Sequence, residues 1–101
     1  MTKLRLAVKA EYFNAMKCGE KTEEYRLVND YWRKRLYHPT TAVGNTARRE
    51  FSGVVITLGY PKDGDTERTL VFPWRGFSQR TITHPHFGSE PVDVFAISVL
   101  P

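Results

Sequence analysis

The chain has 101 residues, of which 41% are apolar, 26% charged and 13% aromatic, a profile that excludes a second independent core and favours a folded chain over a disordered one. No apolar run approaches the roughly 18–20 residues that span a bilayer, and the N-terminus lacks the apolar stretch of a signal peptide. The single cysteine, Cys18, excludes an internal disulfide and a multi-cysteine zinc site. We therefore expect one domain over residues 1–101, in the cytoplasm, with no membrane partner and no cofactor.

The positive charge is concentrated in the first half of the chain. The net charge is +4, with eleven basic and six acidic side chains in residues 1–50 but four basic and five acidic in residues 51–101. A local excess of cations attracts phosphates and steers polyanions. A solvated basic surface gives the same count, so charge alone favours a nucleic-acid partner only slightly.

The first half predicts alternating strands and helices. In chain order the elements are a strand over 3–9, a helix over 11–18, a strand over 21–28 and a helix between Asn29 and Pro39. Period-two alternation of apolar and charged residues identifies the strands. Gly19 ends the first helix, and Asn29 can cap the second.

The second half predicts a loop followed by short strands. Residues 38–49 are polar, and we expect this loop to be the most mobile segment. The strands lie over 54–58, 69–72, 79–83 and 93–99. About six short strands with two flanking helices predict an α+β protein built on a small, curved β-barrel, because closure removes exposed strand edges. An open α+β sheet is the alternative.

A polar row begins the strand that follows Gly19. Alternation places on one side Thr22, Glu24 and Arg26, and on the other, as core, Tyr25 and Leu27. Such a row can simply be an ion pair that fastens the strand. If it lines a cleft instead, Lys21 and Arg26 would meet a phosphate or a base carbonyl. Glu24 would then accept a hydrogen bond from an exocyclic amine.

The pattern Lys-x-Gly-x-Lys-Thr-x-Glu-x-Arg resembles the signature of ASCH domains, which belong to the PUA-like superfamily of small RNA-associated β-barrels. The matching residues are Lys17, Gly19, Lys21, Thr22, Glu24 and Arg26. The resemblance implies a single ASCH-like domain over residues 1–101 and a PUA-like β-barrel with a cleft beside the motif. It also implies RNA or a nucleotide as the ligand, with a modified base among the candidates.

The resemblance carries an enzymatic alternative. Some small bacterial ASCH proteins are amidohydrolases that act on an acylated cytidine nucleoside, and others are reported as ribonucleases. In the amidohydrolase type, a lysine at the position of Lys21 acts with a threonine, where this chain has Glu24, and with a distant glutamate that has no counterpart here. The alternative is therefore a small hydrolase with Lys21 and Glu24 as catalytic residues. A third option is a protein–protein adaptor without cleft chemistry.

Aromatic and basic residues outside the motif extend the predicted surface. The candidate nucleic-acid-binding residues are Lys17, Lys21, Thr22, Glu24, Arg26, Trp32, Arg33, Lys34, Trp74 and Arg75. Trp32 or Trp74 would stack on a base. The cations Arg33, Lys34 and Arg75 would contact phosphates. Trp32 can instead anchor its helix to the barrel, and Trp74 can instead cover one end of the barrel.

Two histidines, His84 and His86, are separated by one residue. In an extended segment both side chains point the same way and can bind a metal, but no third and fourth ligands lie nearby in the sequence, so we predict no metal site. A general acid or base for RNA cleavage is a second interpretation. A turn fixed by imidazole hydrogen bonds is the third.

Overall fold

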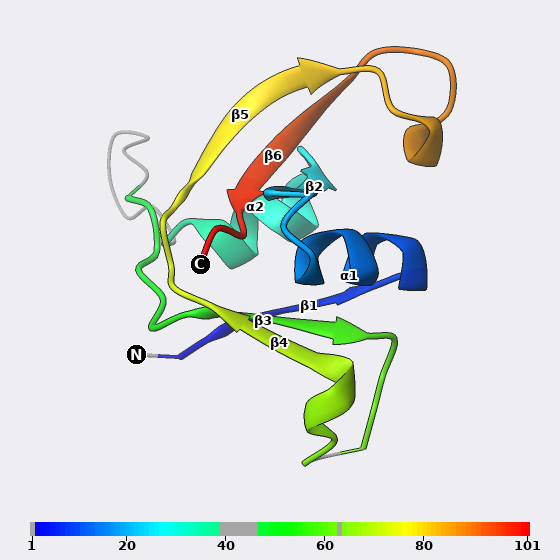
Figure 1. Ribbon diagram of the computed structural model, residues 1–101. Coiled ribbons are helices and arrows are strands. Elements are labelled where there is room, and N and C mark those ends of the chain that lie inside the picture. The colour runs from blue at the N-terminus through cyan, green and yellow to red at the C-terminus, as the bar shows by residue number, and fades with distance from the viewer. Residues whose placement is uncertain (1, 39–46, 63) are drawn as a thin grey trace.

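The structure, a computed structural model, describes residues 2–38, 47–62 and 64–101. In this part of the chain the strands are β1 (Leu4–Val8), β2 (Glu23–Leu27), β3 (Val54–Leu58), β4 (Thr69–Phe72), β5 (Phe77–Ile82) and β6 (Val92–Ser98). The helices are α1 (Ala10–Lys17) and α2 (Asp30–Leu36), with single 3-10 turns η1 (Thr66–Arg68) and η2 (Pro85–Phe87) (Figure 1). Each predicted strand and helix therefore has a counterpart. Residues 39–46 of the predicted loop lie outside the described residues.

The six strands form two three-stranded sheets, and the predicted PUA-like β-barrel is wrong. Sheet A has the order β1-β3-β4, with β1 parallel to β3, whereas sheet B has the order β2-β6-β5 and is antiparallel throughout. Among the described residues no strand ladder joins the two sheets. The chain crosses from β4 to β5 through Pro73, which has no N–H to donate, and Gly76, whose φ of 83° favours glycine. Pro73 directly follows the last residue of β4, and Gly76 directly precedes the first residue of β5, so both lie at the turn between the two sheets.

Two short helices flank β2 in the chain: α1 precedes the strand and α2 follows it. α1 ends before Gly19, whose φ of 85° lets the chain reverse towards β2. α2 begins at its N-cap Asn29, whose side-chain oxygen accepts a hydrogen bond from the backbone N–H of Trp32 at 3.0 Å. Within residues 2–38, 47–62 and 64–101, no helix is both long and apolar enough to cross a membrane.

One hydrophobic core connects both sheets and both helices. Its buried members are Leu4, Leu6, Val8, Phe13, Met16, Leu36, Val54, Ile56, Phe72, Phe77, Phe95, Ile97 and Val99. β6 supplies the centre of sheet B, where Phe95 and Ile97 are almost fully buried. The side of β2 that meets this core is therefore set by its pairing with β6.

β2 turns its charged side inward, so the prediction that Tyr25 and Leu27 form the core is wrong. Glu24 is only 7% exposed and pairs in register with the core residue Ile97. Leu27, on the opposite side, is 38% exposed, and Tyr25 is half-buried. Because β2 is an edge strand of sheet B, its inward side borders a cavity at the free edge. A charged side chain can therefore occupy an inward position there.

Candidate functional site

A cavity of about 350 Å³, hereafter the cleft, is lined by the C-terminal end of β1 and by β2, two edge strands from different sheets. Its charged lining residues are Lys9, Lys21, Glu24 and Arg26. Its aromatic and imidazole lining residues are Tyr12, Tyr25, Trp32, His84, His86 and Phe87. The volume lies at the lower end of the roughly 300–1,000 Å³ range of small-molecule pockets. The cleft thus has the size for one small ligand.

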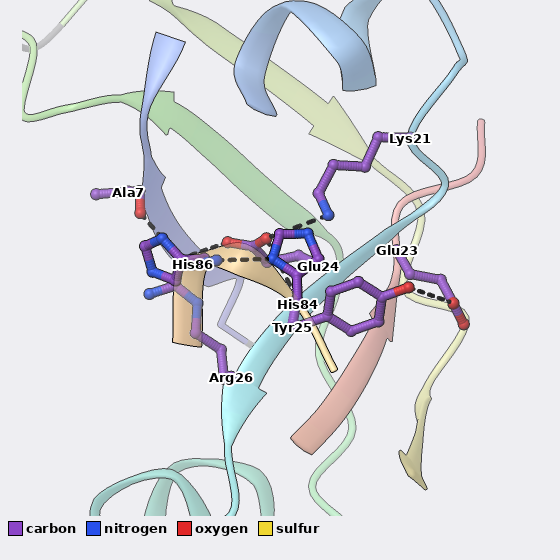
Figure 2. A network of polar contacts seen from close by, with 8 residues as sticks. All are labelled: Ala7, Lys21, Glu23, Glu24, Tyr25, Arg26, His84 and His86. Carbon is purple, nitrogen blue, oxygen red and sulfur yellow. Dashed lines mark hydrogen bonds and ion pairs between the residues drawn. The ribbon is translucent and has the colours of Figure 1, made fainter. Parts of the chain in front are cut away.

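The Glu24 carboxylate lies between two cations (Figure 2). Arg26 donates a hydrogen bond from Nη2 to Glu24 Oε2 at 2.8 Å, and Lys21 Nζ lies 4.0 Å from Glu24 Oε1. The same Arg26 nitrogen donates to the backbone carbonyl of Ala7 at 2.9 Å, which connects β2 to β1 across the cleft. The carboxylate and the guanidinium therefore hold each other in place.

The charged lining residues carry more positive than negative charge. Lys9, Lys21 and Arg26 contribute three cations, against the single carboxylate of Glu24. Charges in a cleft with low-dielectric walls concentrate the field there. An anionic or strongly polar ligand is therefore favoured over an apolar one.

Lys21 is enclosed, although it lies close to the surface turn after α1. Its side chain is 14% exposed, and its Nζ lies 4.5 Å from the ring centre of Tyr25 and 5.2 Å from that of Tyr12. Burial lowers the pKa of Lys21, although Glu24 acts in the opposite direction. This amine therefore loses its proton more readily than an exposed lysine does.

Aromatic rings from three segments build one wall of the cleft. The ring of Tyr12 on α1 lies 5.9 Å from His84 and 5.7 Å from His86, and the ring of Tyr25 lies 5.9 Å from His84. The His86 backbone N–H donates to His84 Nδ1 at 3.1 Å, so a neutral His84 carries its proton on Nε2. This is the hydrogen bond that the turn interpretation predicts. Among the described residues no cluster of three potential metal ligands forms.

Trp32 lies at the edge of the cleft and is already in contact with two guanidinium groups. The centre of the Arg26 guanidinium lies 5.1 Å from its ring centre, and that of Arg35 lies 5.2 Å away. Trp32 also packs against the hydrophobic core. Its ring therefore anchors α2 and positions the guanidinium groups of Arg26 and Arg35.

The structure brings Lys21, Glu24, Arg26 and Trp32 together and places the other predicted site residues elsewhere. Those outside the cleft lining are Lys17, Thr22, Arg33, Lys34, Trp74 and Arg75. Trp74 packs on Phe51, with ring centres 4.9 Å apart. Arg75 donates to the carbonyl of Pro101 at 2.8 Å. These contacts hold the β4–β5 connection away from the cleft.

The sequence does not predict that Tyr12, His84 and His86 line the same cleft as the motif residues. Tyr12 shares the helical spacing of Phe13 and Met16, and that spacing predicts the core. The hydroxyl group of Tyr12, on a helix side shared with the apolar Phe13 and Met16, is the sequence signal for a residue at the rim of the core. The histidines reach the cleft because the connection between β5 and β6 returns to α1, and no local pattern encodes that return.

The chemistry of the cleft comes from a buried carboxylate, two adjacent cations and a wall of aromatic and imidazole rings. Comparisons with protein-family models, with curated proteins and with solved structures found no match to this chain.

Proposed function

We propose that the cleft binds the base of a nucleotide, either free or within RNA. The observation that carries the proposal is a buried carboxylate, Glu24, held between Lys21 and Arg26 in a cavity with aromatic walls. Recognition of an unstacked base uses flat side chains against its face and polar groups against its edge. The cleft offers both kinds of group within one small volume.

The polar groups match the edge of an amino-bearing base. Glu24 would accept a hydrogen bond from an exocyclic amine, which cytosine, adenine and guanine have and uracil lacks. Lys21 would donate to a ring carbonyl or to a phosphate. Arg26 would do the same with the guanidinium N–H groups that do not bond Glu24 or Ala7.

The sequence supplies a second line of support. The motif that contains Lys21, Glu24 and Arg26 resembles that of ASCH domains, which are associated with RNA. A modified base, with an added group on its exocyclic nitrogen, is one candidate within this proposal. The proposal includes a cytoplasmic location.

The test is calorimetric titration of the protein with CMP, UMP, AMP and GMP at low salt. We expect binding of the amino-bearing nucleotides and about tenfold weaker binding by Lys21→Ala and Lys21→Met, since a charge-assisted hydrogen bond is lost. Glu24→Gln should reduce the preference for CMP over UMP. Lys17→Ala is the matched control, because Lys17 belongs to the same motif but lies outside the cleft lining. No binding, or equal losses in the Lys17 and Lys21 variants, would refute the proposal.

A second candidate function, a small hydrolase acting on an acylated nucleoside, is favoured by the lowered pKa of Lys21. A neutral Lys21 amine would accept a proton from water as the water oxygen bonds to the acyl carbon. The carbon–nitrogen bond would then break, and the proton would pass to the leaving amine. Incubation with acylated cytidines and with labelled RNA tests this function. Turnover by the wild type that is lost in Lys21→Met supports the hydrolase. If the wild type shows no turnover, the hydrolase is refuted and base binding is the one proposed function that is left.

A further inference from the structure

A second cavity of about 580 Å³, hereafter the sheet A groove, adjoins the cleft. Ala7, Arg26 and Trp32 line both cavities, so the two adjoin at these residues, where Arg26 bonds the Ala7 carbonyl. The floor of the groove includes Arg5 and Val71, which lie on the side of sheet A that faces away from the core. A chain-like ligand could therefore run from the cleft onto this face of the sheet.

The sheet A groove is strongly cationic. Its basic lining residues are Lys3, Arg5, Arg26, Arg35 and Lys62. Among its described lining residues the one carboxylate is Asp65, which lies 3.7 Å from the guanidinium of Arg68. The Nε atoms of Arg26 and Arg35 are buried without a hydrogen-bond partner in the described part of the chain. The groove thus matches a ligand with several negative charges.

The same groove also exposes large apolar side chains. In the described residues, five large hydrophobic side chains are exposed, and three of them line this groove. They are Tyr31 at 60%, Tyr60 at 96% and Val71 at 60% exposure. Exposed apolar side chains that gather in one place mark interaction sites, and aromatic rings beside cations are the platform on which single strands stack.

We propose that the sheet A groove binds a single-stranded nucleic acid whose one base occupies the cleft. The inference rests on the proposed function and deepens it, because it makes the ligand a strand rather than a free nucleotide. Arg26, at the junction, is placed to contact the phosphate beside the bound base. The neighbouring phosphates would meet Lys3, Arg5 and Arg35, and a neighbouring base would stack on Tyr60. An acidic peptide would satisfy the cations but would leave the rings unused.

The experiment compares a mononucleotide with labelled single strands of about eight nucleotides, a length within the known range of single-strand sites. RNA and DNA strands are both measured by fluorescence anisotropy over a series of salt concentrations. We expect strands to bind at least about tenfold more tightly than the mononucleotide, with an affinity that falls as salt rises. Binding of either strand type supports the proposal, which concerns phosphates and bases.

Two kinds of variant separate charge from stacking. Lys3→Gln with Arg5→Gln should weaken strand binding and reduce the salt slope by about 1.4, roughly 0.7 for each phosphate contact of a single strand, without changing mononucleotide binding. Tyr60→Ser should weaken strand binding about tenfold at an unchanged salt slope, since it removes a stacking ring. Arg33→Gln with Lys34→Gln is the matched control: it removes two exposed charges from α2 outside both cavities and should change neither quantity.

The outcomes distinguish the groove from the cleft. One outcome is that strands bind no more tightly than a mononucleotide, while mononucleotide binding still depends on Lys21. The groove proposal is then overturned and the proposed function stands. If strands bind through Lys3 and Arg5 but mononucleotides do not bind, the groove is supported and the base-binding function falls. Equal affinity for a polyglutamate peptide would also overturn the groove proposal, because charge alone would then explain binding.

Discussion

Glu24 and Arg26 show how one ion pair can shape a site and stabilise the fold. A buried carboxylate is costly unless cations and donors compensate it, and Glu24 is almost fully buried. Arg26 supplies the shorter of its two cationic contacts, at 2.8 Å against 4.0 Å for Lys21. Since Arg26 also bonds the Ala7 carbonyl, its loss would leave acceptors without partners on both β1 and β2.

Replacing Arg26 by methionine keeps an apolar stem but removes the guanidinium. We expect Arg26→Met to lower the free energy of unfolding by about 1.5–3 kcal/mol, the usual worth of a hydrogen bond to a charged group. Urea denaturation measures the change. The loss should be clearly smaller when Arg26→Met is made in a Glu24→Gln background, because no buried carboxylate is then left without its partner. Equal losses in both backgrounds would show that the two side chains are not coupled.

At the scale of elements, local sequence signals predict where helices begin and end but not which side of β2 faces the core. The cap at Asn29 and the helix stop at Gly19 depend on neighbouring residues alone, so the sequence predicts them and the structure confirms them. The inward side of β2 depends on its pairing with β6, about 70 residues further along the chain. Alternation identifies two sides of a strand but does not say which is covered.

The N-cap of α2 should support both stability and the placement of Trp32. Asn29→Ala removes the acceptor for the Trp32 N–H, and we expect a loss of about 1 kcal/mol in the free energy of unfolding. Asn29→Asp retains an acceptor and should retain most of the stability. Chemical denaturation of both variants is the measurement. A similar loss in the two would rule out capping as the cause.

Glu23 and Arg80 connect β2 to β5 within sheet B through a contact between Glu23 Oε2 and Arg80 Nη2. This hydrogen bond holds the pKa of Glu23 below its usual range. Because the pKa of Glu23 is lower in the folded protein, the unfolded chain binds more protons in acid. The contact therefore stabilises the fold fully at pH values above the ordinary glutamate pKa of about 4.3. This stabilisation is lost as the pH falls through the lowered pKa of the folded protein.

Glu23→Gln should therefore be less stable than the wild type at about pH 7 and should approach it at about pH 3. Both side chains are partly exposed, so solvent screens the contact and the difference should be small. Arg80→Gln should show the same pH dependence, and the double variant should lose no more than either single variant. Unfolding free energies across this pH range provide the measurement. A difference that does not vary with pH would contradict the assignment to this contact.

For the whole molecule, the sequence predicts the elements better than their assembly. The closed barrel followed from the number of short strands, but strand count does not choose partners. β1 and β4 are the edge strands of one sheet and β2 and β5 those of the other, and among the described residues no ladder joins an edge of one sheet to an edge of the other. For the site, the motif predicts Lys21, Glu24 and Arg26, whereas the aromatic wall depends on a long-range return of the chain that no local pattern contains.

The hydrogen bond from Arg26 to the Ala7 carbonyl joins β1 and β2, two edge strands between which the described residues form no ladder. A ladder joins many peptide groups and separates only when the backbone unfolds locally, whereas a guanidinium changes its acceptor by rotating a side chain. A phosphate that enters the cleft would compete with the Ala7 carbonyl for the Arg26 guanidinium. The side of the cleft between β1 and β2 would then widen during ligand binding without the loss of any strand pairing.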